Sequence, residues 1–244
     1  MNSFVAPYPY YEFQFDLFFI NDLDNQKFNV GALMIDIFTK YMVVVHIKTK
    51  NEGDVASALI ECLHKMCKNR EIIYGDDERS LNSTAIQKYL KENNIKHIIT
   101  RNHAWFAERG IRTFKDALYK RIDNSKNENP QWTDYIFEIL LTYNNKLKHS
   151  STKYTPNEAR QEKNELNIKL NLTLHKKHTR TYPILEVGSK VKIYRKKRTG
   201  EEERTSTWSE NTYEVEKIIQ SLGQTFFIVN GLERHYMRSE LLKV

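Results

Sequence analysis

The sequence predicts a mixed α/β domain followed by a small all-β unit. Through residue 160, apolar runs typical of strands alternate with segments whose apolar residues recur at helical spacing. After residue 184, short runs of β-branched and aromatic residues are separated by glycines, a pattern typical of small barrels. We therefore expect an α/β domain over residues 1–160, a connecting segment over 161–184 and an all-β domain over 185–244.

Three apolar runs near the start of the chain predict three consecutive strands. They cover residues 10–20, 28–37 and 41–47. The second and third runs are joined by the short Thr39-Lys40 turn. Sequential strands with short connections favour an antiparallel meander.

Helices and strands then alternate along the chain. Apolar residues at helical spacing predict a helix over residues 52–68, and further helices are expected over 84–92, 107–122 and 132–146. Short apolar runs at 72–74 and 95–100 predict two more strands. The expected order of elements, up to and including the 107–122 helix, is therefore β-β-β-α-β-α-β-α. Pro156 is expected to open a further helical turn with Thr155 as its N-cap.

The connecting segment has no clear periodicity. Residues 161–182 are rich in Asn, Lys and His, and both a linker and an extended helix remain open for them. Beyond it, apolar runs near residues 191–194, 213–215, 218–219 and 226–229 predict the short strands of the all-β domain.

Composition excludes several classes of protein. No apolar run approaches the length of a membrane span, and Met1 is not followed by a signal-peptide pattern. The two cysteines, Cys62 and Cys67, lie inside a helical pattern, which argues against a disulfide framework or a Cys-rich zinc site. We expect an intracellular protein that is neither secreted nor inserted in a membrane.

The net charge of +7 is concentrated in one part of the chain. Residues 176–205 contain 10 Lys and Arg against 4 Asp and Glu, so this window alone carries 10 − 4 = +6. Such a block indicates a nucleic-acid partner when a phosphate-chemistry site accompanies it. By itself, such a basic run is usually a solvated face or a linker.

Three acidic residues lie where chemistry is expected. Asp16 interrupts the first strand, Asp76 follows the strand at 72–74, and Glu108 opens the 107–122 helix. Carboxylates gathered at a sheet repel one another unless a divalent cation lies between them. The three residues therefore predict a two-metal phosphoryl-transfer site. Asp77 and Glu78 are rival ligands to Asp76.

Cations follow Glu108 on its own helix. Arg112 and Lys115 lie four and seven positions after Glu108, so the three share one helix face. That face has the chemistry to hold a metal ion and a DNA backbone together. An ordinary exposed helix with an ion pair one turn apart fits the same spacing.

Four segments resemble retroviral-type integrases, in the order in which that family carries them. Residues 107–115, AERGIRTFK, resemble the family's "ERxNRTLK" helix, and residues 34–41, MIDIFTKY, resemble its "vvDxfSry" strand and turn. Residues 143–159 resemble its "YNxxxHxxxxxxPxEa" segment. Residues 187–193, VGSKVKI, with the closing SELLKV at 239–244, are similar to its C-terminal SH3-like barrel.

The resemblance implies a ribonuclease-H-like mixed-sheet core followed by an SH3-like barrel, in a DNA integrase that performs 3′-end processing and strand transfer. Asp16, Asp76 and Glu108 match the family's catalytic acids, which hold two Mg²⁺ ions, with Mn²⁺ as a substitute. Double-stranded DNA, a homo-oligomer and the host nucleus are implied too, and the subgroup suggested is the Maverick/Polinton or virophage-like one. The residues expected to bind DNA are Arg112, Lys115, Lys190, Lys192, Arg195, Lys196 and Lys197.

The chain also departs from the family's pattern. Asp77-Glu78-Arg79-Ser80-Leu81 replaces the usual Asn-Gly and acidic-aromatic pair, and 108 − 76 = 32 positions separate the last two acids. No zinc module of the His-His-Cys-Cys type precedes the core in this sequence. A catalytically inactive or domesticated DNA-binding protein and a ribonuclease-H-like nuclease therefore remain alternatives. A ribonuclease H would need neither the barrel nor the Thr155-Pro156 segment.

Overall fold

The computed structural model describes residues 5–66, 71–76, 81, 83–100, 104–175, 182–195, 206–221 and 224–244, with the backbone alone at residues 76, 99, 100, 221 and 224. These residues fall into two compact units, one within Phe4–Lys176 and the other within Lys177–Val244. Each unit has its own core and is described by itself.

A five-stranded mixed sheet forms the centre of the first unit, in the order β3-β2-β1-β4-β5. The strands β1 (Glu12–Phe19), β2 (Val30–Asp36) and β3 (Met42–Ile47) are antiparallel, which confirms the expected meander. The strands β4 (Ile72–Asp76) and β5 (Lys96–Thr100) run parallel to β1. Asp76 was expected just beyond its strand, but the backbone pairing with β5 continues to Asp76 and makes it the last residue of β4.

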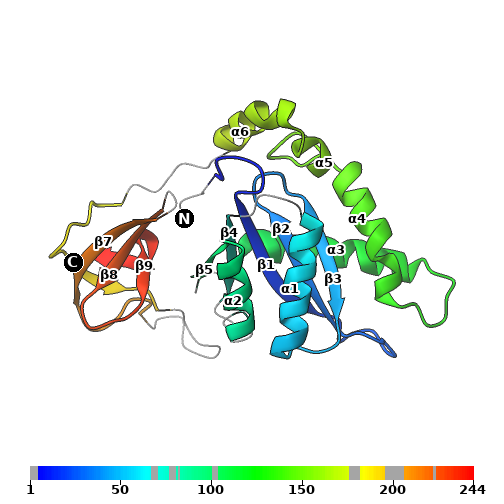
Figure 1. Ribbon diagram of the computed structural model, residues 1–244, viewed down its shortest axis with the longest axis horizontal. Helices are drawn as coiled ribbons and strands as arrows, with labels where there is room; N and C mark the ends of the chain where they lie inside the picture. The colour runs from blue at the N-terminus through cyan, green and yellow to red at the C-terminus, as the bar shows by residue number, and fades with distance from the viewer. Residues whose placement is uncertain are drawn as a thin grey trace. The chain divides into compact units, whose positions relative to one another are not determined.

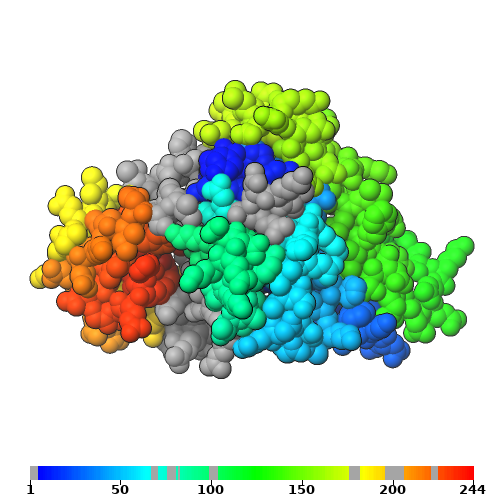
Figure 2. All heavy atoms as spheres, in the orientation of Figure 1, coloured from blue at the N-terminus to red at the C-terminus, as the bar shows by residue number. Residues whose placement is uncertain are grey.

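Helices cover both faces of this sheet (Figure 1). The helices α1 (Glu52–Met66) and α2 (Thr84–Glu92) pack on one face, and their side chains close over it in Figure 2. The helix α3 (Trp105–Asp123), the short η1 (Trp132–Tyr135) and α4 (Ile136–Asn145) pack on the other. The observed order β-β-β-α-β-α-β-α is the order predicted from periodicity.

Alternation along β1 divides its side chains between the two faces. Phe13, Phe15 and Leu17 enter the core beneath α1 and α2, whereas Phe18 enters the core beneath α3. Because successive residues of a strand point to opposite faces, Gln14 and Asp16 belong to the α3 side with Phe18. The central strand therefore presents its polar residues to α3.

A helical segment follows α4. The helix α5 (Pro156–Ala159) begins with a capping box in which Thr155 and Glu158 exchange side-chain and backbone hydrogen bonds, so the expected N-cap is confirmed. The short η2 (Glu162–Asn164) and α6 (Glu165–Leu174) come next. Of the two possibilities left open for this stretch, helix is what the structure has up to Leu174.

The second unit is an antiparallel sheet of five strands in the order β10-β6-β7-β8-β9. Its elements are β6 (Lys190–Ile193), β7 (Tyr213–Ser221), β8 (Gln224–Val229), β9 (His235–Met237), η3 (Arg238–Glu240) and β10 (Leu241–Lys243). The two apolar runs at 213–219 form one strand, because a register shift between Val215 and Lys217 bends β7 without ending it. An all-β unit is thus present where it was expected.

None of the helices in the described part of the chain combines the length and the apolar character needed to cross a membrane.

Gly31 makes room for an aromatic cluster on the α3 side of the sheet. Gly31 pairs with Phe18 across β1 and β2, and a Cβ atom at Gly31 would lie 2.2 Å from Cζ of the Phe18 ring. The Phe18 ring centroid lies 5.6 Å from that of Phe114 in α3 and 5.6 Å from that of Trp132 in η1. The missing side chain at Gly31 therefore allows Phe18 to pack against both elements.

Replacing Gly31 with Ala should destabilise the first unit. The new methyl group would push the Phe18 ring out of this cluster, at a cost of about 1–3 kcal/mol in the free energy of unfolding. Chemical denaturation measures this loss. Gly53→Ala is the matched control, because its added Cβ meets only the Asn51 side chain at 3.5 Å. Equal stability of the two variants would contradict the packing role of Gly31.

Candidate active site

Gln14 of β1 binds the start of α3. Its side chain is buried, and its Oε1 accepts hydrogen bonds from the backbone N–H of Phe106 at 2.8 Å and of Ala107 at 3.3 Å. The first N–H groups of a helix have no partner within the helix. The N-cap residue Ala104 makes no side-chain cap hydrogen bond, so a glutamine from the neighbouring strand satisfies two of these donors.

Further along, α3 contacts the other end of β1. The Nζ of Lys115 donates to the carbonyl oxygen of Phe19 at 2.7 Å, and the hydroxyl of Tyr119 donates to Oδ1 of Asp22 at 2.7 Å. The helix therefore runs beside β1 and the loop after it. Contacts at both ends of this stretch fix which residues of α3 lie beside which residues of β1.

Asp16 and Glu108 lie between these contacts. Asp16 falls between Gln14 and Phe19 on the α3 side of β1, and Glu108 directly follows Ala107 in α3. Glu108 shares the flank of α3 that carries Lys115 and Tyr119, since residues seven and eleven positions apart project in similar directions. Both carboxylates are half-buried. The first predicted acid therefore lies on the side of β1 against which α3 packs, and the third lies in the first turn of that helix.

The backbone of Asp76 lies next to that of Asp16. In the parallel pairing of β1 and β4, Phe15 is opposite Gly75. Asp16 and Asp76 are the next positions on their strands, so the register brings their backbones together. The side chain of Asp76, like residues 77–80, lies outside the described part of the structure.

Lys40 provides a second contact to the start of α3. It occupies the β2–β3 turn with φ of +65°, is buried, and its Nζ lies 3.8 Å from the ring centroid of Phe106. That nitrogen also donates to the carbonyl oxygen of Ile37. Phe106 is therefore bound through its backbone by Gln14 and through its ring by Lys40.

A buried carboxylate pair accompanies Lys40. Asp36 accepts hydrogen bonds from the N–H groups of Tyr10 and Phe38 and from the Thr39 hydroxyl, so its carboxylate stabilises the β2–β3 turn. Burial, and then the charge of Asp36, raise the pKa of Glu12 to about 7. Burial lowers the pKa of Lys40 to about 7. Among the described atoms, Oε2 of Glu12 has no hydrogen-bond partner, in keeping with a carboxyl group that is protonated up to neutral pH.

The donor chemistry at the candidate site fits a hard divalent cation. Asp16 and Glu108 offer carboxylate oxygens, which Mg²⁺ and Mn²⁺ prefer as ligands. Within the described side chains, which do not include that of Asp76, no group of three or more His, Cys, Asp and Glu residues is arranged to hold a metal ion. The two described carboxylates are thus a partial donor set that a third acid would complete.

The predicted DNA-binding residues divide between the two units. On α3, Arg112 is exposed, whereas Lys115 is half-buried and tied to the carbonyl of Phe19. In the second unit, Lys190 and Lys192 alternate with apolar residues along β6, and Arg195 lies two positions after the end of this strand. Lys196 and Lys197 lie outside the described residues.

Gln14, Lys40 and Trp105 were missed by the sequence analysis. Gln14 lies two residues before Asp16, so a polar residue on the same face of a buried strand was the available signal. Lys40 and Trp105 gave none, because their surroundings come from distant segments of the chain.

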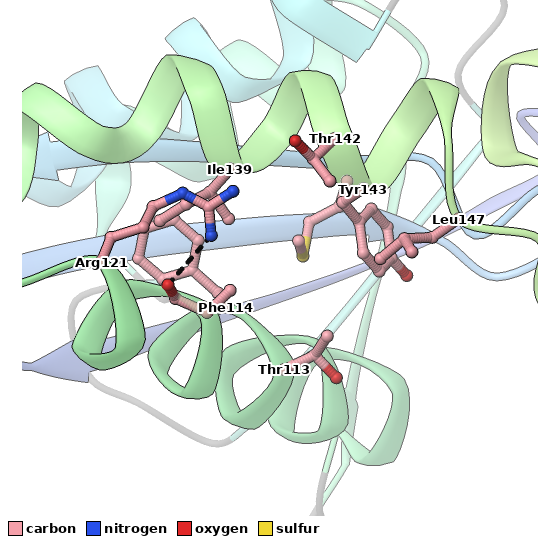
Figure 3. A pocket seen from close by; sticks show the side chains of 9 residues that line it. Thr113, Phe114, Arg121, Ile139, Thr142, Tyr143 and Leu147 are labelled. Atoms are coloured by element: carbon pink, nitrogen blue, oxygen red, sulfur yellow. Dashed lines mark hydrogen bonds between the residues drawn. The ribbon is translucent and has the colours of Figure 1, made fainter. Parts of the chain in front are cut away.

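A small hollow lies between α3 and α4 (Figure 3). It holds about 30 Å³ of space for solvent, roughly one water molecule. Its α3 lining, which includes Thr113, Phe114 and Arg121, is on the opposite flank of the helix from Glu108. The hollow is too small for a substrate and is separate from the carboxylates.

The fold is that of retroviral integrases. The chain covers 97% of the HTLV-2 integrase catalytic core domain, solved in complex with magnesium in a trimeric form, with a TM-score of 0.55 and 19% identity over 63% of this chain. Its dimeric form matches with a TM-score of 0.54 and 20% identity over 63% of this chain and 97% of that one. The first unit therefore shares the fold of that integrase catalytic core domain, which is consistent with the ribonuclease-H-like sheet expected from the sequence.

A chain from a larger assembly aligns over both units. It belongs to the simian T-cell lymphotropic virus intasome, solved in complex with PP2A regulatory subunit B56 gamma, and the match covers 99% of this chain and 81% of that chain, with a TM-score of 0.69 and 14% identity. No family profile matches the sequence. In sequence, the chain is 28% identical over 140 residues to the retrovirus-related Pol polyprotein from transposon 297 of Drosophila melanogaster. That match spans 57% of this chain and 13% of the polyprotein. The chain is thus retroviral-integrase-like.

Replacing Gln14 with Leu should loosen the start of α3. The change removes the acceptor for two N–H groups, at a cost of about 1–3 kcal/mol. Hydrogen exchange should then accelerate at the amides of Phe106 and Ala107. Gln14→Glu keeps an acceptor and should keep both amides protected. Unchanged exchange in Gln14→Leu would contradict the capping role.

Replacing Glu12 with Gln should stabilise the protein in a pH-dependent manner. The folded-state pKa of about 7 lies above the ordinary value of 4.5, so Glu12 lowers wild-type stability as pH rises from 4.5 through 7. Gln does not titrate, and the variant should gain up to about 2–3 kcal/mol over wild type near pH 8 and almost nothing near pH 4. Unfolding measured at both pH values tests this. Glu61→Gln, at an exposed position on α1, is the control and should change stability little at either pH.

Proposed function

We propose that this chain is a DNA integrase that carries out metal-dependent 3′-end processing and strand transfer of a mobile-element or viral DNA. The observation that carries the proposal is that Asp16 lies on the α3 side of β1 and Glu108 in the first turn of α3, between contacts that fix the helix against β1. The shared integrase fold and the sequence match to a retrovirus-related Pol polyprotein support it. A nuclease on the same fold would share the core, and the second unit favours the integrase.

In this proposal Asp16, Asp76 and Glu108 are the metal ligands and catalytic residues. Two bound Mg²⁺ ions, or Mn²⁺ in their place, would supply activation of the attacking oxygen and neutralisation of charge on the phosphate. Asp16 is held by the central strand, and Glu108 by a helix whose first turn is bound by Gln14 and Lys40. These contacts keep the two carboxylates in place, so binding of metal and DNA requires little reorganisation of the chain.

The DNA partner is proposed to contact both units. Arg112 and Lys115 would approach the element end from α3, while Lys190, Lys192 and Arg195, with Lys196 and Lys197, would bind phosphates of double-stranded DNA. Phosphate contacts fix the register of the DNA and give affinity that falls as salt rises. We propose that residues 1–160 act as the catalytic core, 161–184 as the connection and 185–244 as an SH3-like barrel.

The setting of the reaction belongs to the same proposal. The protein would work as a homo-oligomer in the host nucleus, and its source would be an element of the Maverick/Polinton or virophage-like group. The solved integrases that it resembles have been captured in trimeric and dimeric forms and as an intasome. The length of the matching polyprotein shows that such a core can be part of a much longer chain.

Asp16→Asn and Glu108→Gln should each abolish joining of a labelled DNA end to plasmid in Mg²⁺ or Mn²⁺. Loss of a metal-binding carboxylate is expected to lower the rate about a thousandfold or more, about 4 kcal/mol of transition-state stabilisation. DNA binding should change little. The control is Asp116→Asn, because Asp116 is an exposed acid on α3 eight positions after Glu108.

Two results would contradict the assignment. Joining that persists in either variant would show that the site has been misplaced. A wild-type protein that binds DNA but neither cleaves nor joins it would favour the DNA-binding alternative over the enzyme.

A further inference from the structure

Trp105 is a large aromatic side chain left in solvent beside the candidate carboxylates. It is the first residue of α3 and is 53% exposed, whereas Trp132 of the same unit is fully buried. Its neighbours Ala104 and Ala107 are fully buried. The side chain therefore does not belong to the core that holds the helix.

Helical spacing places Trp105 on a charged stripe. Glu108, Arg109 and Arg112 follow it at three, four and seven positions, so all four residues share one side of α3. Arg109 and Arg112 are exposed, and Glu108 is half-buried on the edge that faces β1. The indole thus lies one helical turn from the carboxylate and one turn from a cation.

The first turn of α3 is a fixed platform for this indole. Gln14 binds the N–H groups of Phe106 and Ala107, and Lys40 lies 3.8 Å from the centroid of the Phe106 ring. The two residues next along the helix are thereby immobilised from two directions. Their contacts limit how far the backbone of Trp105 can move relative to Glu108.

The surroundings favour a nucleic-acid ligand over an apolar protein partner. Protein-binding patches are contiguous apolar surfaces of a few hundred Å². Among the described residues of α3, the neighbours of this indole at helical spacing are the two arginines and Glu108. An aromatic face next to cations suits an unstacked base whose adjoining phosphates need positive charge.

We propose that Trp105 stacks on an unpaired nucleobase at the end of the DNA, while Arg109 and Arg112 contact the phosphates beside that base. The proposal rests on the function proposed above for its choice of DNA as ligand. Stacking tolerates any base, so Trp105 would hold a frayed end open and direct the terminal phosphodiester towards Glu108. It would distinguish opened ends from continuous duplex rather than one sequence from another.

Binding measured in Ca²⁺, without turnover, tests this proposal. The probes are a short blunt duplex, the same duplex with a single-stranded overhang, and that overhang with abasic nucleotides. The wild type should bind the natural overhang about tenfold more tightly than the abasic one, within the range of aromatic stacking on one base. Trp105→Ala should remove this preference and leave blunt-duplex affinity nearly unchanged, and Trp105→Phe should keep most of it.

Phe137→Ala is the matched control, because Phe137 is a 76%-exposed aromatic residue on α4. It should behave as the wild type with every probe. Tryptophan fluorescence gives a second measurement, since the chain has three tryptophans and Trp132 is buried. The overhang should quench the emission of the wild type more strongly than that of Trp105→Phe, in which Trp132 and Trp208 remain.

The possible failures are distinct. A wild type that binds all three probes equally, or a Trp105→Ala variant that keeps the preference, would overturn the stacking role and leave integration intact. An equal loss of affinity for all probes in Trp105→Ala would make Trp105 a general DNA contact and would also overturn the proposal. Absence of any DNA binding by the wild type would overturn both proposals.

Discussion

The hydrogen bonds between Gln14 and the first turn of α3 are the contacts on which the arrangement of the candidate site depends. They join residues 92 and 93 positions apart in the chain. A helix packed on a sheet through apolar side chains alone can slide, because such contacts have little directional preference. Directional bonds to two successive N–H groups define where α3 begins relative to β1. The position of Glu108 relative to β1, and so to Asp16, follows from where the helix begins.

The buried side of α3 adds a second constraint. Phe114 and Trp132 pack around the Phe18 ring, which occupies the space above Gly31. The polar bonds of Gln14 and Lys115 and the aromatic cluster therefore hold the helix against the sheet at different points along its length. Burial supplies most of the energy, and the polar contacts select one position among those that burial alone would permit.

Three buried ionisable residues lie near the first turn of α3. Lys40 lies against Phe106 in the interior, and the charges of Asp36 and Glu12 offset only part of the effect of burial, which lowers the pKa of Lys40. Asp36 accepts three hydrogen bonds that stabilise the turn in which Lys40 lies. Glu12 keeps a raised pKa because burial is incompletely compensated there. A buried charged group tolerated next to a site is a common sign that position has been favoured over stability.

Local sequence patterns determined much of the secondary structure of this protein. Local sequence patterns predicted the order of elements as far as α3, the bounds of α2, and the placement of Asp16 on a strand and Glu108 on a helix, because each depends on neighbours within a few residues. Only the tertiary structure decided that β4 lies beside β1, that Gln14 and Lys40 bind α3, and that Trp105 remains exposed. These features arise from contacts between segments far apart in the chain, and no local periodicity encodes which distant segment will be the partner.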